Sequence, residues 1–187
     1  PPVTTSAMVG KDLGTEVEFR NCARSGATTC DFLPESGRDW PKVAQAMKEF
    51  KSKCDAGEDI IFSIMLGTND SAIDGTTTGS PVSRADYKKN LKCIIDACHE
   101  VCPNAIFVLH RPIWYSPNTY NGTMYLAAGL KRVSRYIDEL VALANEFDYI
   151  YLGDVDGFCF FEKNHKRFHY AEIGYQEDVS ELGRRYR

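Results

Sequence analysis

The sequence predicts an α/β fold, a three-layer α/β/α sandwich around a parallel, flavodoxin-like sheet. Short apolar runs of strand length alternate with longer amphipathic stretches, and no run is long enough to span a membrane. Strands separated by helices imply parallel pairing, with helices on both faces of the sheet. The 187 residues are 43% hydrophobic and 26% charged, which suits a single domain, residues 1–187, with a sizeable core.

The first half of the chain gives the following elements. Residues 1–10 read as the end of a helix, with Gly10 or Gly14 as its stop. Residues 17–20 are predicted as a short strand that opens into a loop of small residues, 21–29. A helix then begins near Trp40, because Pro41 suits a first turn and the apolar residues after it recur at helical spacing. The apolar run 60–66 follows as a buried strand.

The second half continues the alternation. Ser83 and Asp86 form a capping pattern ahead of an amphipathic helix. Two further strands are predicted at residues 105–110 and 149–152, separated by the loop 111–122 and one long helix. The apolar positions that predict this long helix are Leu126, Leu130, Val133, Ile137, Leu140 and Val141.

Polar residues directly after the strand at 60–66 predict an active site. Gly67 and Asn69 lie at the carboxyl end of this strand, the edge at which α/β proteins bind their ligands. The Asn69 amide can donate a hydrogen bond to an oxyanion, and a glycine at 67 lets the backbone approach a substrate. Because the loop 21–29 also follows a predicted strand, the two loops together predict a two-part oxyanion hole.

These two stretches resemble the GDSL/SGNH hydrolase family. Asn21 to Thr28 matches the family's Asn-x-x-x-Ser-Gly-x-Thr block, and Gly67 to Asp70 matches its Gly-x-Asn-Asp block, in the family's order. The resemblance implies a serine-dependent esterase or acylhydrolase. It assigns the oxyanion to the backbone N–H of Gly26 and the side chain of Asn69, and it implies no metal or cofactor.

The family's nucleophile, a serine in a Gly-Asp-Ser block, is not found in this sequence. We expect the first strand and the nucleophile loop to precede Pro1. The alternative is a non-catalytic relative that binds carbohydrate or acts as a scaffold. Ser25 and Ser6 do not fit the role, because Ser25 lies beside the oxyanion donor Gly26 and Ser6 has no elbow glycines around it.

The general base is predicted to be His169. The resemblance implies a final Asp-x-x-His block, and His169 is followed by Gly174 and Tyr175 as the family pattern requires. Lys166 replaces the aspartate, and a lysine cannot accept the imidazole N–H. The acids that could orient His169 instead are Asp154, Asp156 and Glu162. A second solution is the pair Glu162 and His165, and a third is a histidine block beyond Arg187.

The loop 111–122 predicts the substrate class. Flat aromatic faces beside amide groups suit sugar recognition, so we expect a small-molecule or carbohydrate ester, and the residues that carry this are Trp114, Tyr115, Asn118 and Tyr120. The same aromatics could instead pack the loop onto the body of the protein. A net charge of −4 gives no nucleic-acid footprint, and no glycine-rich phosphate loop supports a flavodoxin-like cofactor binder.

The seven cysteines are an odd number without zinc-site spacing, so mostly free thiols are expected. Cys98 and Cys102 share a helical face and are expected to act as buried small hydrophobic residues. Both a bacterial cytoplasmic and an exported location are compatible with this composition.

Overall fold

The computed structural model describes residues 2–73, 77–119 and 125–168. Cys22–Lys163 forms one compact unit, and the described residues on either side of it form a second, smaller unit. The larger unit contains the sheet and both candidate oxyanion loops. In the described part of the chain, no helix combines the length and the apolar character needed to cross a bilayer.

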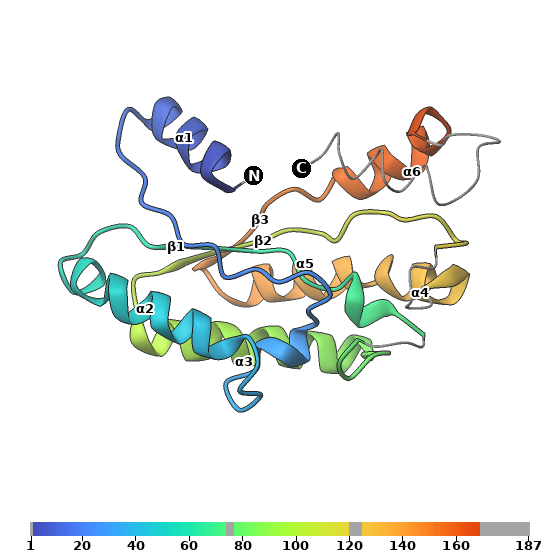
Figure 1. Cartoon of the computed structure of the whole chain (residues 1–187), viewed down its shortest axis with the longest axis horizontal. Helices are drawn as coiled ribbons and strands as arrows, with labels where there is room; N and C mark the ends of the chain where they lie inside the picture. Colours follow the sequence, from blue (N-terminus) through green and yellow to red (C-terminus); the bar gives the residue numbers. More distant parts are fainter. Residues whose placement is uncertain (1, 74–76, 120–124, 169–187) are drawn as a thin grey trace. The chain divides into compact units, whose positions relative to one another are not determined.

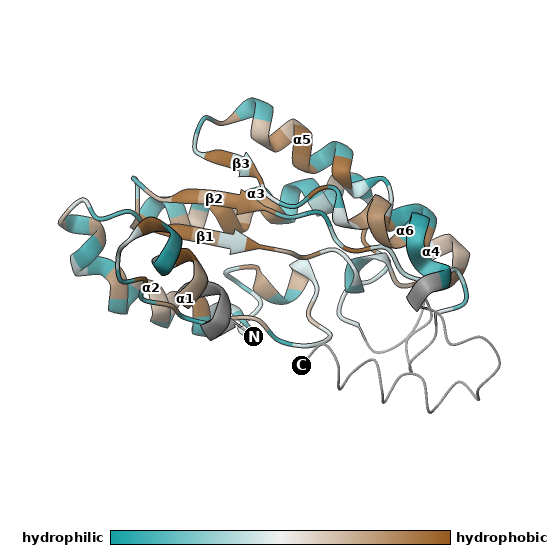
Figure 2. Ribbon diagram, turned by 90° about the horizontal axis from the view of Figure 1, so that it is seen from above, coloured by the Kyte–Doolittle hydropathy of each residue, from teal (hydrophilic) through white to brown (hydrophobic). Residues whose placement is uncertain are grey.

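The larger unit is built on a parallel sheet of three strands. These are β1 (Ile61–Ile64), β2 (Ile106–Leu109) and β3 (Ile150–Leu152), with β2 in the middle (Figure 2). Ile64 pairs with Leu109, which in turn pairs with Leu152, so the three carboxyl ends are level. All three strands were predicted from their apolar runs, and their parallel pairing is confirmed.

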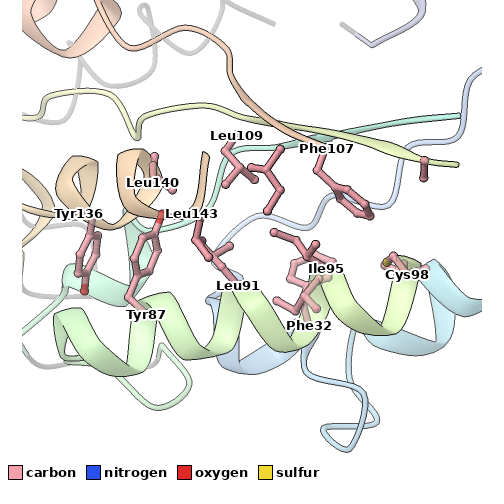
Figure 3. Close-up of a cluster of buried hydrophobic side chains, with 14 of the residues drawn as sticks. Phe32, Tyr87, Leu91, Ile95, Cys98, Phe107, Leu109, Tyr136, Leu140 and Leu143 are labelled. Carbon is pink, nitrogen blue, oxygen red and sulfur yellow. The ribbon is translucent and has the colours of Figure 1, made fainter. Parts of the chain in front are cut away.

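Helices α2 (Trp40–Asp55), α3 (Arg84–Val101) and α5 (Tyr136–Glu146) lie on one side of the sheet (Figure 1). Phe107 and Leu109 point from β2 into this layer and are fully buried, with Leu91 and Ile95 of α3 facing them (Figure 3). The predicted starts of both α2 and α3 are confirmed: Pro41 lies in the first turn of α2, and the Asp86 N–H donates to Ser83 Oγ at 3.1 Å. Hydrophobic burial of the apolar helix faces therefore holds these helices on the sheet.

The cysteines agree with the sequence interpretation. All seven lie in the described residues and are free thiols. Cys98 and Cys102 belong to the hydrophobic core, where burial raises the pKa of Cys98 to about 12 and that of Cys102 to about 11. Because a thiol is reactive only as the thiolate, these two act as small hydrophobic residues.

The chain starts with helix α1 (Pro2–Leu13), which confirms the predicted initial helix. Gly14 has φ +66°, and the Thr15 N–H donates to the Gly10 carbonyl at 3.0 Å, so Gly14 ends the helix as a C-terminal cap. The strand predicted at residues 17–20 is wrong, because this segment makes no strand pairing. In a flavodoxin-like order, 2-1-3-4-5, it would pair only with a strand before it, and the described residues there are helical.

The single long helix predicted over Leu126 to Val141 is also wrong in one respect. It is broken into α4 (Leu126–Val133) and α5, with Ser134 and Arg135 between them. Arg111 donates to the Ser134 carbonyl at 3.3 Å, and the Asp138 N–H bonds to the Arg135 carbonyl instead. A side chain from another element thus takes a carbonyl that a continuous helix would use.

Three short elements complete the described chain. Two 3₁₀ helices, η1 (Thr29–Phe32) and η2 (Asn69–Ser71), begin within the candidate oxyanion loops. Helix α6 (Gly157–Phe168) comes after β3. Its first turn is capped by Asp154, whose Oδ1 accepts the N–H groups of Asp156 at 3.0 Å and Gly157 at 2.8 Å.

Candidate active site

The two loops predicted to form the oxyanion hole are in direct contact. Asn69 Nδ2 donates to the carbonyl oxygen of Ala27 at 2.8 Å. In addition, the Thr29 N–H donates to Asp70 Oδ1 at 2.9 Å, and the Thr29 hydroxyl donates to the same oxygen. Residues more than forty positions apart in the sequence are therefore fastened together, which places Gly26 next to the loop that carries Asn69.

Gly26 lies at the exposed tip of its loop. Its φ is +80°, and no atom lies within 4 Å of the position that a Cβ would take. Its N–H has no hydrogen-bond partner among residues 2–73, 77–119 and 125–168. A backbone donor in open space is available to a bound ligand.

Two buried carboxylates, those of Asp31 and Asp39, hold the backbone around Gly26. The Arg24 guanidinium bonds both carboxylate oxygens of Asp39, at 2.8 and 2.9 Å, and also contacts Asp31 at 3.0 Å. Asp31 is fully buried and accepts the Thr28 N–H at 2.9 Å. Burial acts against its charge, but this hydrogen bond and the guanidinium groups of Arg24 and Arg38 lower the pKa of Asp31 overall. The loop is therefore held by a carboxylate that stays ionised at neutral pH.

Gly67 has a packing role. Its φ is +128°, and an added Cβ would lie 2.8 Å from Pro112, 3.1 Å from Tyr136 and 3.2 Å from Tyr87. The side on which a side chain would stand is thus filled by the protein itself. Glycine is needed there so that the loop after β1 can pack on these three residues. Its participation in substrate binding stays a prediction.

Asp70 is fully buried between the two loops. Its Oδ1 accepts both hydrogen bonds from Thr29, whereas Oδ2 has no partner among the described residues. Burial raises the pKa of Asp70 from its usual 3.8 to about 6, although the Thr29 bonds act in the opposite direction. This carboxyl joins the loops and does not reach solvent.

The predicted substrate loop lies partly on the site. Tyr115 Oη donates to Ser71 Oγ at 2.8 Å, since the Ser71 hydroxyl hydrogen is directed to the Thr68 carbonyl at 2.6 Å. Trp114 and Tyr115 both pack against the hydrophobic core, and Asn118 is exposed. Tyr120 lies outside the described residues. Of the predicted substrate residues that the structure describes, Tyr115 is therefore the one that it brings to the Asn69 loop.

The structure describes some of the residues predicted for the general base, but not all of them. His169 lies outside the described residues. Glu162 and His165 are one turn apart on α6, with Glu162 exposed and His165 half-buried. Asp154, considered as a partner for His169, uses its carboxylate to cap α6. The choice among these bases stays a prediction.

A serine and a histidine meet on the sheet but do not form a catalytic pair. Ser63 Oγ lies 3.0 Å from His110 Nε2, and His110 Nδ1 accepts the Asp154 N–H at 2.9 Å. An accepting Nδ1 leaves the proton of the neutral ring on Nε2, which then donates to Ser63. Burial lowers the pKa of His110, although Asp154 opposes this effect. The ring therefore has no free nitrogen with which to take a proton from Ser63.

Three residues that contact the Asn69 loop were missed in the sequence. Tyr125 Oη lies 2.7 Å from Asn69 Oδ1, and Arg132 donates to the Ser71 carbonyl at 2.8 Å. Gly129 lies between them and approaches so closely that a Cβ would be 2.8 Å from the same carbonyl. Positions 125, 129 and 132 share one helical face, and a glycine inside an apolar helix pattern was the available signal.

The parallel α/β sheet carries the Asn69 loop after β1, and this loop is hydrogen-bonded to the loop of Gly26, whose backbone N–H is exposed. The sequence model of the GDSL-like lipase/acylhydrolase family matches residues 4–176, so the chain belongs to this family. Together with the parallel sheet, this confirms the three-layer α/β/α fold class. A comparison with curated proteins and one with solved structures gave no match.

Proposed function

We propose that this family member is a serine-dependent esterase in which the Gly26 N–H and the Asn69 side chain bind the oxyanion. The observation that carries the proposal is the hydrogen bond between Asn69 Nδ2 and the Ala27 carbonyl. It uses one of the two hydrogens on Nδ2 and joins the loop of Asn69 to that of Gly26. One amide hydrogen and one backbone N–H then remain as donors from adjoining loops.

The reaction proceeds by acyl transfer. A serine oxygen attacks the ester carbonyl while a histidine takes the serine proton, and the negative charge develops on the carbonyl oxygen. The two donors stabilise this charge in the tetrahedral intermediate. The C–O bond to the alcohol then breaks, the histidine returns the proton to the leaving alkoxide, and water releases the acyl group by the same steps.

The remaining catalytic groups are carried over from the sequence. The nucleophile is the serine of the family's Gly-Asp-Ser block, and His169 is the first choice of base, with Glu162 and His165 as the alternative pair. Ser63 and His110 are excluded as substitutes by the hydrogen bond that His110 Nδ1 accepts. This scheme uses no metal ion or cofactor.

The proposed substrates are small acyl esters of carbohydrates. This rests on the loop after β2, where Tyr115 meets the Asn69 loop and Asn118 presents an amide to solvent. An aromatic ring and an exposed amide on the same loop suit a sugar, which has both apolar faces and hydroxyl groups. A faster reaction with an acetylated sugar than with p-nitrophenyl acetate, compared by kcat/KM, would support this class.

The catalytic proposal is tested by labelling and by substitution in the protein made from its complete reading frame. A fluorophosphonate probe followed by peptide mapping should label one serine. Asn69→Ala should lower kcat for p-nitrophenyl acetate by about 10²–10³, as removal of an oxyanion donor does elsewhere. Asn118→Ala serves as a control, because Asn118 is exposed and is assigned only to the sugar.

The outcomes separate the alternatives. A labelled serine together with a loss of kcat in Asn69→Ala supports the esterase. Labelling with unchanged kcat in Asn69→Ala would remove Asn69 from the mechanism. Neither labelling nor ester hydrolysis would favour the alternative, a carbohydrate-binding or scaffold protein that keeps the fold without the chemistry.

A further inference from the structure

Asn69 is held at both ends of its amide group. Nδ2 lies 2.8 Å from the Ala27 carbonyl oxygen, and Oδ1 lies 2.7 Å from Tyr125 Oη. A carbonyl oxygen can only accept a hydrogen bond, so the amide nitrogen must face Ala27. The amide oxygen therefore faces Tyr125, whose phenol is the donor. These two contacts leave one amide hydrogen on Nδ2 without a partner among the described residues.

Tyr125 is well placed to keep this arrangement. Its side chain is 5% exposed, and its ring packs edge-on against Tyr115 with the centroids 5.3 Å apart. Burial raises the pKa of Tyr125, so the hydroxyl remains a donor throughout the neutral range. The next residue, Leu126, has φ +50°, a conformation that a leucine adopts only when its surroundings impose it.

Helix α4 fastens Tyr125 to the Asn69 loop at two further points. Gly129 allows the helix to approach the Ser71 carbonyl, and Arg132 donates to that carbonyl at 2.8 Å. The helix therefore cannot move away from η2 without losing both contacts. These two contacts set the distance between Tyr125 Oη and Asn69 Oδ1.

We propose that Tyr125 is a positioning residue for ester hydrolysis, which fixes the Asn69 amide so that its remaining N–H is directed at the oxyanion. The inference rests on the proposed function of Asn69. The phenol acts in two ways. It prevents rotation of the carboxamide, and by donating to the amide oxygen it makes the N–H at the other end a stronger donor.

The test compares Tyr125→Phe with two other variants in the protein made from its complete reading frame. Tyr125→Phe should lower kcat for p-nitrophenyl acetate by about tenfold with little change in KM, less than the 10²–10³ expected for Asn69→Ala. In the Asn69→Ala background, Tyr125→Phe should have no further effect on kcat, because the phenol acts only through the amide.

Tyr136→Phe is the matched control. Its side chain is also buried, and its phenol donates to the Val82 carbonyl at 2.7 Å and not to Asn69. It should lower the melting temperature as much as Tyr125→Phe does, yet leave kcat unchanged. An equal loss of kcat in both tyrosine variants would show a general structural effect and overturn the proposal.

The remaining outcomes distinguish a failure of the role given to Tyr125 from a failure of the proposed esterase activity. If Asn69→Ala lowers kcat and Tyr125→Phe does not, the role of Tyr125 is wrong and the proposed esterase stands. If Asn69→Ala leaves kcat unchanged, both fail. Should Tyr125→Phe not fold, the ¹⁵N relaxation of the Asn69 side chain in the unmodified protein decides: a rigid carboxamide supports the proposal, and one that rotates freely on the nanosecond timescale overturns it.

Discussion

Asp70 is fully buried, and its Oδ2 accepts no hydrogen bond from the part of the chain that the structure describes, which disfavours the charged form of this carboxyl. Its pKa is raised from 3.8 to about 6 by burial, so the folded protein binds this proton more tightly than the unfolded chain. The contribution of this proton to stability is fully present below pH 3.8 and is lost as the pH rises through about 6. The size of the effect is on the order of 3 kcal/mol.

Asp70→Asn should therefore change the pH dependence of stability. Asparagine keeps an oxygen for the two Thr29 bonds but cannot ionise. Relative to the parent protein, the free energy of unfolding of the variant should rise between pH 4 and pH 7 by about 2–3 kcal/mol, following the linkage between pKa and stability. Urea unfolding of both proteins across this range measures the difference.

Asp31→Asn is the control for this prediction. The pKa of Asp31 is lowered, so its charge stabilises the fold above pH 3.8, and that stabilisation is lost only as the pH falls through its folded value. The variant should be less stable than the parent by an amount that is constant from pH 4.5 to pH 7.5. A constant offset for Asp70→Asn as well would show that Asp70 is ionised in the folded protein throughout this range.

Some residues of the candidate site could be predicted from the sequence, and others could not. Asn69 could be found because the stretch from Gly67 to Asp70, directly after an apolar strand, matches a block of the GDSL/SGNH family. Tyr125 could not, since its contact with Asn69 depends on where α4 packs, and that placement is fixed by Gly129 and Arg132. A short stretch of the sequence does not show which distant element of the fold it will contact.

At the scale of loops and helices, Gly26 and Gly67 look alike in the sequence but differ in the structure. Both have positive φ, yet the Cβ position of Gly26 is open and that of Gly67 is filled. Gly26→Ala should cost only the backbone strain, about 1–2 kcal/mol. Gly67→Ala adds a clash with buried side chains and should cost about 3 kcal/mol or more in total.

The two alanine variants are compared by chemical unfolding at one pH. Each serves as the control for the other, because both introduce the same methyl group at a left-handed position. Similar losses in the two proteins would mean that Pro112, Tyr136 and Tyr87 yield easily around Gly67. A larger loss at Gly67 would support a packing role for this glycine.

Helix boundaries show the same limit of local patterns. The start of α3 was predicted correctly because its cap is formed by neighbours in the sequence, Ser83 and Asp86. The break between α4 and α5 was not predicted, since Arg111 reaches the Ser134 carbonyl from a loop 23 positions away. Elements that end through their own residues can be predicted, whereas those interrupted from outside cannot.

At the scale of the whole molecule, the alternation of apolar runs was enough to predict a parallel α/β fold. The strand predicted at residues 17–20 failed because a strand needs a partner, and periodicity alone does not supply one. The three observed strands succeed because each has an apolar sequence and a neighbour of the same kind.

The central strand should therefore determine the stability of the unit Cys22–Lys163. Phe107 is fully buried in β2, stacks on Phe62 with the ring centroids 5.0 Å apart, and faces α3 (Figure 3). Phe107→Ala should lower the free energy of unfolding by about 3–5 kcal/mol, because it removes apolar contacts and leaves a cavity. Chemical unfolding gives this value.

In Phe107→Ala, native-state hydrogen exchange should show the same loss of opening free energy for the amides of α3 and α5, if the helices and the sheet unfold together. The reason is that Leu91 and Leu143 belong to the same core cluster as Phe107, so removing one member weakens burial for all of them. Phe160→Ala is the control, since this ring is 51% exposed and its removal should cost less than about 1 kcal/mol. Reduced protection confined to β2 would show instead that the sheet opens separately from its helices.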